Sequence, residues 1–252
     1  MIEILILSLV QGITEFLPIS SSSHLILISD YLNFDEQGLT IDVSLHIGSF
    51  FAVIFYFYKD IVNFYENKIL FFKIFISSIP IMIIGFFLTR SGVIEGIRGL
   101  EIIGWTTLIF GILLYISDKF KLDKNIKNDF NLKSAIFIGL LQILSLVPGV
   151  SRSGIAITAA RFLNFKRTDA AKISFLISIP ILGAVSFYGL TNILFIENAD
   201  LTIKNLIAIS LSFLFSLITI KYFLKYISRF SLNIFIFYRV GLGCILLILA
   251  YL

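Results

Sequence analysis

Long apolar runs occupy most of the chain and limit what it can fold into. Six of them cover residues 43–58, 70–89, 101–117, 171–195, 203–221 and 233–252. A helix of about 20 apolar residues crosses the hydrocarbon core of a bilayer. Hydrophobic residues make up 58% of the sequence and charged residues 14%, far from the composition of a soluble domain. Because the alternation of barrel strands is also missing, the sequence predicts an all-α integral membrane protein.

Two further apolar stretches, residues 1–29 and 133–162, are each interrupted by a polar motif. The first motif is QGITEFLPISSSSH at residues 11–24, and the second is PGVSRSG at residues 148–154. Ionisable groups at membrane depth cost about 2.5–3.5 kcal/mol each on insertion scales. Ionisable residues kept at such a cost indicate a functional role. We therefore interpret the two motifs as the halves of one site.

The basic residues predict how the chain is oriented. Fifteen of them fall in four loops that we assign to the cytoplasm, against three in the loops on the other side. Two consecutive cytoplasmic loops, 118–133 and 161–172, enclose a stretch of about 28 residues. That stretch is too short for two full spans, so we predict a re-entrant pair of half-helices. By the same logic, residues 1–29 form a second such pair.

The predicted fold is a single membrane domain with two internal halves, about 1–120 and 130–252. It has six transmembrane helices plus two re-entrant half-helix pairs, arranged as an inverted-topology repeat whose motifs meet near the midplane. One observation does not fit this plan. The tetrapeptide Ser-Ile-Pro-Ile occurs at 78–81 and again at 178–181, in spans that are not equivalent in the two halves.

The side chains of the motifs predict an anion site. A helix over residues 5–17 would place Gln11 and Glu15 one turn apart on one face. In the second motif, Ser151 and Ser153 are candidate N-caps for a half-helix that starts near Gly154. Free N–H groups at that helix end, together with an arginine fork and serine hydroxyls, suit a phosphate.

The chemistry of this site leaves several alternatives open. Glu15 repels an anion unless it also binds a cation, so we expect a divalent ion held by Glu15 and phosphate oxygens. His24 is then a candidate general acid, general base or nucleophile. The non-catalytic alternative is that Glu15 and Arg152 form a purely structural ion pair. We interpret His46 as structural, and the lone Cys244 makes a cysteine metal site a poor candidate.

The motifs also carry a family resemblance. Both resemble signatures of the bacterial undecaprenyl-diphosphatase family of the bacitracin-resistance type, and so does DVSLHIGSFFAV at residues 42–53. The resemblance covers essentially the whole chain. It implies a multi-pass enzyme of the bacterial inner (plasma) membrane that removes the terminal phosphate of undecaprenyl diphosphate. The product is the lipid carrier for peptidoglycan and other envelope polymers, and the reaction requires a divalent cation, Mg²⁺ or Ca²⁺.

The resemblance also implies roles for individual residues. The catalytic set is Glu15, Ser21, His24 and Arg152, with Glu15 as the metal ligand or base. The substrate-binding set is Gln11, Ser20, Ser22, Gly149, Ser151 and Ser153. The nucleophile stays open between Ser21, His24 and water. Two positions depart from the family pattern, because Gln11 replaces a carboxylate that many members have and Ser23 stands where a glycine is usual.

The implied partners are the polyprenyl diphosphate, membrane lipids and, as an open alternative, a second copy of the chain in a homodimer. We predict no nucleic-acid partner, since the basic residues that give the net charge of +4 lie mostly in short loops between the spans. The rival function is a flippase for polyprenyl phosphate or an anion transporter that uses the same midplane site. The serine-rich loop beside His24 favours chemistry, because transport needs no nucleophile and no proton donor.

Overall fold

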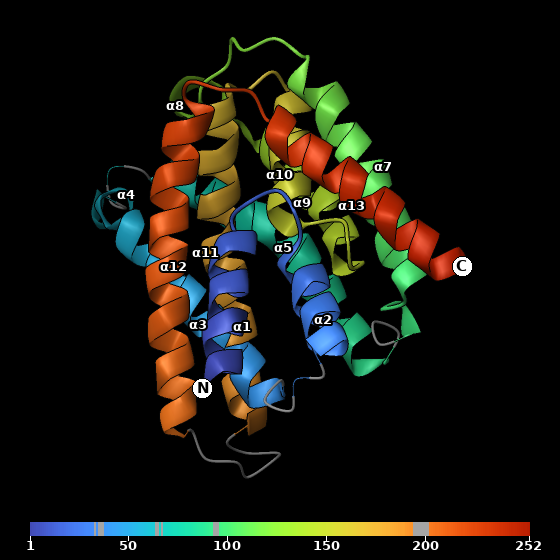
Figure 1. Cartoon of the computed structure of the whole chain (residues 1–252). Coiled ribbons are helices and arrows are strands. Elements are labelled where there is room, and N and C mark those ends of the chain that lie inside the picture. The colour runs from blue at the N-terminus through green and yellow to red at the C-terminus, as the bar shows by residue number, and fades with distance from the viewer. Residues whose placement is uncertain (33, 35–37, 64–65, 67, 93–95, 194–201) are drawn as a thin grey trace.

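Helices form all the regular secondary structure in the part of the chain that the computed structural model describes, namely 1–252 without residues 33, 35–37, 64–65, 67, 93–95 and 194–201 (Figure 1). The helices in the first half are α1 (Ile2–Thr14), α2 (Ser21–Leu32), α3 (Leu39–Tyr56), α4 (Tyr58–Val62), α5 (Lys68–Arg90) and α7 (Leu100–Asp118). Those in the second half are α8 (Ile126–Asp129), α9 (Leu132–Gln142), the 3-10 helix η2 (Ile143–Leu146), α10 (Arg152–Phe162), α11 (Arg167–Thr191), α12 (Ile203–Ile227) and α13 (Asn233–Tyr251).

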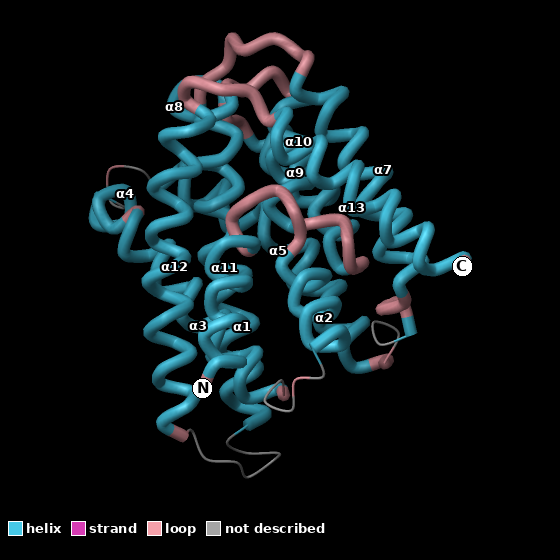
Figure 2. Tube along the Cα trace, viewed as in Figure 1, coloured by secondary structure: helices cyan, strands magenta, loops and turns pink. Residues whose placement is uncertain are grey.

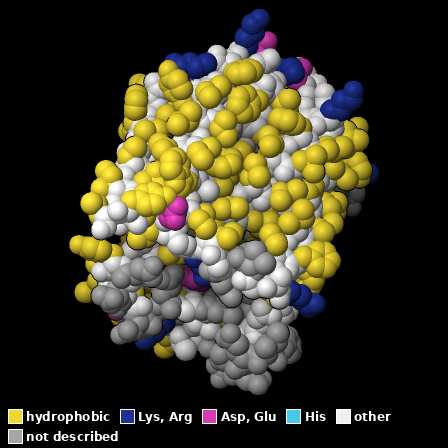
Figure 3. Space-filling model, turned by 90° about the vertical axis from the view of Figure 1, so that its right-hand side faces the viewer, with side chains coloured by type: hydrophobic (Ala, Val, Ile, Leu, Met, Phe, Trp, Pro, Cys, Tyr) yellow, Lys and Arg dark blue, Asp and Glu magenta, His cyan; other side chains and the backbone are white. Residues whose placement is uncertain are grey.

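Five helices within the described residues are long and apolar enough to cross a membrane: α5, α7, α11, α12 and α13. Helix α3 is equally apolar in character but shorter. Large hydrophobic side chains such as Phe72, Phe87 and Phe187 are exposed on the outside of these helices. Figure 3 shows such side chains covering one face of the molecule, with Lys and Arg at its edges. The prediction of an all-α, multi-pass membrane protein is confirmed.

Both polar motifs form bends between short helices, and Figure 2 shows the first of these loops near the middle of the molecule. Helix α1 ends at Thr14, three residues earlier than the sequence predicts. Pro18 accounts for this difference, because proline has no N–H with which to extend the helical hydrogen bonding. In the second motif, helix α10 starts at Arg152 with Ser151 as its N-cap, and Ser153 already lies inside the helix.

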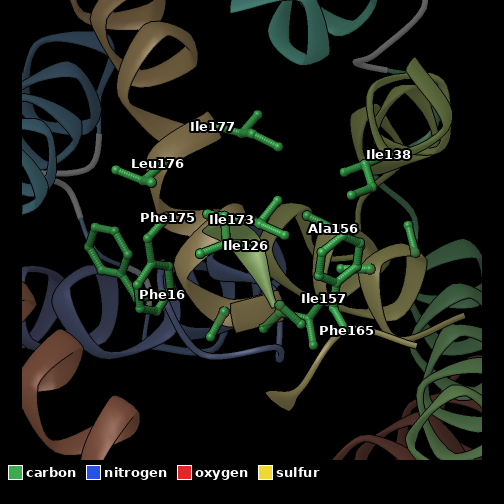
Figure 4. Packing of buried hydrophobic residues seen from close by; sticks show 14 of the residues in the cluster. Phe16, Ile126, Ile138, Ala156, Ile157, Phe165, Ile173, Phe175, Leu176 and Ile177 are labelled. Atoms are coloured by element: carbon green, nitrogen blue, oxygen red, sulfur yellow. The ribbon is translucent and has the colours of Figure 1, made fainter. Parts of the chain in front are cut away.

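Packing in the core holds the first bend in place. Phe16 is fully buried and its ring meets Phe175 of α11 edge to face, with ring centroids 5.3 Å apart (Figure 4). The two bends are also joined directly, since the Ser153 hydroxyl donates to the Leu17 carbonyl oxygen at 2.7 Å. The first loop is therefore fixed both to the core and to the second loop.

The helices pack in pairs across the two halves of the chain. α3 packs along α12, α7 along α13, α1 on α12, and α9 on α5. The α3–α12 contact is close because small residues line it: Ser49 bonds Ser212 at 3.2 Å and Ser216 at 3.0 Å. Small and hydroxylated residues are typical of helix contacts inside membranes.

The two Ser-Ile-Pro-Ile sequences lie in helices that contact each other, α5 and α11. The Ser78 hydroxyl of the first copy is 3.3 Å from the carbonyl oxygen of Ile177, the residue just before the second copy. The two copies of the tetrapeptide thus lie at the contact between α5 and α11. It still relates spans that are not equivalent in the predicted repeat.

The close α3–α12 contact depends on the missing side chain of Gly48. A Cβ atom there would lie 2.4 Å from the carbonyl oxygen of Ile209. We expect Gly48→Ala to destabilise the protein by about 1–3 kcal/mol, the usual range for overpacking a close contact. Thermal unfolding in detergent measures this. The matched control is Gly241→Ala, where an added Cβ meets nothing within 4 Å, and equal melting temperatures for the two variants would contradict the prediction.

Candidate active site

The Glu15 carboxylate connects three side chains from the two motifs. Its Oε1 accepts from Nη2 of Arg152 at 2.8 Å, while Oε2 accepts from the Ser21 hydroxyl at 2.7 Å and from Nε2 of Gln11 at 3.2 Å. Glu15 is only 6% exposed and stands at the C-cap of α1, where the first bend begins. The structure therefore brings the two motifs together around one buried carboxylate.

A polar cavity of about 160 Å³ lies beside this carboxylate. Among its lining residues are Glu15, Ser20, Ser21, Ser22, Ser151 and Arg152. The guanidinium of Arg152 has one nitrogen, Nη1, that is buried and has no hydrogen-bond partner among the described residues. This nitrogen is thus available to a further acceptor. A phosphate oxygen is the kind of acceptor that an arginine fork binds.

Two half-helices begin at the cavity, each after a serine with strained backbone. Ser20 has φ 75° and precedes α2, and Ser151 has φ 72° and precedes α10. Such left-handed conformations in residues other than glycine cost of order 1–3 kcal/mol each and concentrate at functional sites. The strain directs the N-terminal ends of α2 and α10 at the same cavity. Helix N-termini offer free N–H groups and positive partial charge to an anion.

Three residues predicted to bind substrate do not line the cavity. Gln11 is fully buried and bonds the carboxylate of Glu15. The Ser153 hydroxyl holds the first loop through Leu17. Gly149 has φ +93°, and a Cβ there would lie 2.0 Å from the Thr106 hydroxyl oxygen. These three residues shape and support the site from behind the lining.

The predicted catalytic histidine, His24, also lies outside the cavity lining. Its Nδ1 is 2.6 Å from the Ser20 carbonyl oxygen, which can only accept, so Nδ1 carries a proton. Its Nε2 is 2.7 Å from the Tyr238 hydroxyl of α13, and the two rings stack with centroids 5.7 Å apart. Both nitrogens of His24 are thus engaged by protein groups, the Ser20 carbonyl oxygen and the Tyr238 hydroxyl.

The imidazole that does line the cavity is His46 of α3. It shares this cavity with Glu15. The interpretation of His46 as structural did not anticipate this position, and it stays a prediction. The sequence feature that could have indicated a place at the site is the third motif, DVSLHIGSFFAV at residues 42–53, which contains His46.

Sequence reasoning also missed Arg239, which is fully buried in α13. Its guanidinium donates to four carbonyl oxygens: those of Pro18 at 3.1 Å, Gly149 at 2.8 Å, Val150 at 3.0 Å and Thr107 at 3.3 Å. One side chain therefore holds both loops and helix α7 together. The signal was a lone arginine inside the apolar run 233–252, because ionisable residues within spans mark functional positions.

An apolar cavity of about 500 Å³ adjoins the polar one. It lies between α5 and α11, and both cavities are lined by Ile81, Leu146, Ile181 and Val185. The other side chains around it include Met82, Phe86, Ala184 and Tyr188. A polar chamber that adjoins a hydrocarbon-lined one suits a molecule with a charged head and an apolar tail.

The lining residues limit the metal that the site can hold. No group of three or more His, Cys, Asp and Glu side chains comes together among the described residues. Within the part of the chain that the structure describes, Glu15 is the one carboxylate that lines the polar cavity. Mg²⁺ is commonly bound by one or two carboxylates together with substrate phosphates, whereas Ca²⁺ takes six to eight oxygen ligands. The site therefore fits a magnesium ion carried by a phosphorylated substrate better than a resident calcium ion.

Comparison with known proteins identifies the family of this chain. Residues 4–245 match the family described as "Bacitracin resistance protein BacA". The chain belongs to this family. The BacA-family relatives include an undecaprenyl-diphosphatase of Pelagibacter ubique (strain HTCC1062), 49% identical over 251 residues, which cover 99% of this chain and 98% of the relative. The undecaprenyl-diphosphatase of Jannaschia sp. (strain CCS1) is 40% identical and covers 98% of this chain and 97% of its own.

Arg239 gives a test of how the BacA-family site is held together. We expect Arg239→Met to destabilise the fold by about 3 kcal/mol or more, since each buried carbonyl left unpaired costs roughly 1–3 kcal/mol. Denaturant unfolding in detergent measures the change. Arg229→Met is the matched control, because Arg229 is exposed in the turn after α12. A loss no larger than that of the control would contradict the role assigned to Arg239.

Proposed function

We propose that this chain hydrolyses undecaprenyl diphosphate to undecaprenyl phosphate and inorganic phosphate. It would thereby recycle the lipid carrier for peptidoglycan and other envelope polymers. The observation that carries the proposal is the buried Glu15 carboxylate between the Ser21 hydroxyl and an Arg152 with one free nitrogen. The relatives named as undecaprenyl-diphosphatases, which match nearly the whole chain, support the choice of substrate.

In the proposed complex, the diphosphate occupies the polar cavity and the prenyl tail occupies the apolar cavity between α5 and α11. Arg152 Nη1 and the N-terminal ends of α2 and α10 would offset the charge of the phosphates. The shared lining at Leu146 and Val185 then marks the junction between head and tail. A magnesium ion held by Glu15 and the diphosphate oxygens would neutralise further charge as the phosphoryl group is transferred.

The geometry favours Ser21 as the nucleophile. Its hydroxyl already donates to Glu15 at 2.7 Å, within the reach that a general base requires. In the proposed step, the Ser21 oxygen bonds to the terminal phosphorus and its proton moves to Glu15. The bond between the bridging oxygen and this phosphorus breaks, and its electron pair leaves with undecaprenyl phosphate. A water molecule then releases inorganic phosphate from the serine.

The rival reading, a flippase or anion transporter, is not favoured by the comparisons. It also gives no reason for the hydroxyl of Ser21 to be paired with a carboxylate. Both readings place an anionic lipid in the same cavity, so binding alone does not separate them. Release of inorganic phosphate does.

We expect purified protein to release phosphate from a polyprenyl diphosphate in detergent when Mg²⁺ is present, and to stop when it is chelated. Glu15→Gln and Ser21→Ala should each slow release by about 10²–10⁴-fold, the usual contribution of a general base or its nucleophile. Glu101→Gln is the control, since Glu101 bonds Tyr251 away from the cavity. Lipid binding without phosphate release by folded wild-type protein would favour the flippase.

We further infer six spans, with α3 as the sixth, and two re-entrant pairs, α1–α2 and α9–α10, in an inverted-topology repeat. In such a repeat, α1 corresponds to α9, α3 to α11 and α5 to α12. The contacts agree with this correspondence. Helix α1 packs on α12 as α9 packs on α5, and α3 packs on α12 as α11 packs on α5. The membrane would be the bacterial plasma membrane, with the basic loops in the cytoplasm. The cavity residues Ile181 and Val185 lie in the half of α11 away from its basic start, so the site would face the outer side.

Cysteine labelling tests this topology. In a Cys244→Ser background, Ser91→Cys should react with a membrane-impermeant maleimide in intact spheroplasts. Asp123→Cys should react only after the membrane is broken, because it lies in the lysine-rich loop 118–133. Both positions are exposed to solvent. The reverse pattern would overturn the assigned orientation, and equal labelling of both would overturn the odd number of crossings between them.

A further inference from the structure

His46 is the one imidazole among the residues that line the polar cavity. It comes from α3, outside both polar motifs. Its Nδ1 lies 2.8 Å from the Asp42 carbonyl oxygen, one helical turn earlier. Because a carbonyl oxygen only accepts, Nδ1 carries the proton, and the neutral ring keeps a lone pair on Nε2. The backbone thus sets the tautomer, as a second group commonly does for a working histidine.

The two histidines of the chain differ in what their ring nitrogens can reach. Both nitrogens of His24 are engaged, by the Ser20 carbonyl and the Tyr238 hydroxyl, and the ring lies outside the cavity lining. His46 has one nitrogen tied to its own helix, and its side chain shares the cavity with Ser21 and Arg152. A proton acceptor in this cavity is therefore available at His46 and not at His24.

The proposed reaction needs such an acceptor. Once Glu15 has taken the proton of Ser21, it is protonated and cannot activate the water of the second step. Among the cavity-lining residues, Arg152 only donates and the serine hydroxyls are poor bases at neutral pH. An imidazole with a free lone pair fills this gap, since histidine is the side chain most often used for such proton transfers.

We propose that His46 is a catalytic residue whose Nε2 takes a proton from the water that hydrolyses the phosphoserine at Ser21. This inference rests on the proposed function. The water oxygen bonds to phosphorus as one of its protons moves to Nε2. The bond between phosphorus and the Ser21 oxygen breaks, its electron pair stays on that oxygen, and the proton held by Glu15 returns to it. Inorganic phosphate leaves, and His46 gives its proton to bulk water.

The test uses full-length protein and a polyprenyl diphosphate that is radiolabelled in its terminal phosphate. We expect His46→Gln to slow steady release of phosphate by about 10²–10⁴-fold. The first turnover should still form polyprenyl phosphate, so the label should remain on the protein as an acid-stable serine phosphate. His24→Gln is the matched comparison and should not trap the label. Adding Ser21→Ala to His46→Gln should abolish the trapped label.

Four results would overturn the assignment: release by His46→Gln at the wild-type rate, slow release without trapped label, trapped label that acid removes as from a phosphohistidine, or label trapped by His24→Gln instead. The melting temperature of His46→Gln shows whether a loss comes from misfolding, and the trapped label is a signal that an unfolded variant cannot give. Folded wild-type protein that binds the lipid and releases no phosphate would overturn the proposed function itself, which separates the two failures.

Discussion

The ion pair between Glu15 and Arg152 is the interaction on which the rest of the site depends. Removing one partner of a buried pair typically costs about 3–5 kcal/mol, because the other charge is left without compensation. Here the two partners come from motifs 137 positions apart in the chain, so the pair also joins the two bends. The Ser21 hydroxyl and the Gln11 amide satisfy the second oxygen of Glu15. Both oxygens of the carboxylate are therefore bonded, whereas Nη1 of Arg152 and Oε1 of Gln11 are buried without a partner among the described residues.

The bends are possible at membrane depth because other side chains satisfy their backbone. Irregular backbone in a membrane is tolerated only where protein or water meets its hydrogen-bonding groups. Arg239 supplies donors to Pro18, Gly149 and Val150, and the Thr106 hydroxyl donates to Pro148 at 2.6 Å. A guanidinium buried without a carboxylate is costly, and its four carbonyl partners offset that cost. The geometry of the candidate site thus depends on Arg239, which does not line the cavity.

Sequence reasoning predicted the features that depend only on the order of residues along the chain. Apolar length predicts that α5, α7, α11, α12 and α13 exist, and the cost of buried charge predicts that the two motifs belong together. It did not give the positions of the two histidine rings, because side-chain direction depends on the backbone at the bend, which hydrophobic periodicity does not indicate. Ser20 at φ 75° rotates the start of α2, and His24 then faces Tyr238. Arg239 was missed because it lies within a run that reads as a plain span, although its charge was visible there.

The position of the two cavities explains why an enzyme for a membrane lipid would be built from re-entrant loops. A soluble site could offer the same carboxylate, hydroxyl and guanidinium, but a long prenyl tail would have to leave the bilayer to reach it. Removing apolar surface from hydrocarbon into water costs about 25 cal/mol for each Å² exposed. Here Ile81, Leu146, Ile181 and Val185 line both the polar and the apolar cavity. The tail can then stay among apolar side chains while the diphosphate reaches Glu15 and Arg152, so the lipid does not have to leave the bilayer to react.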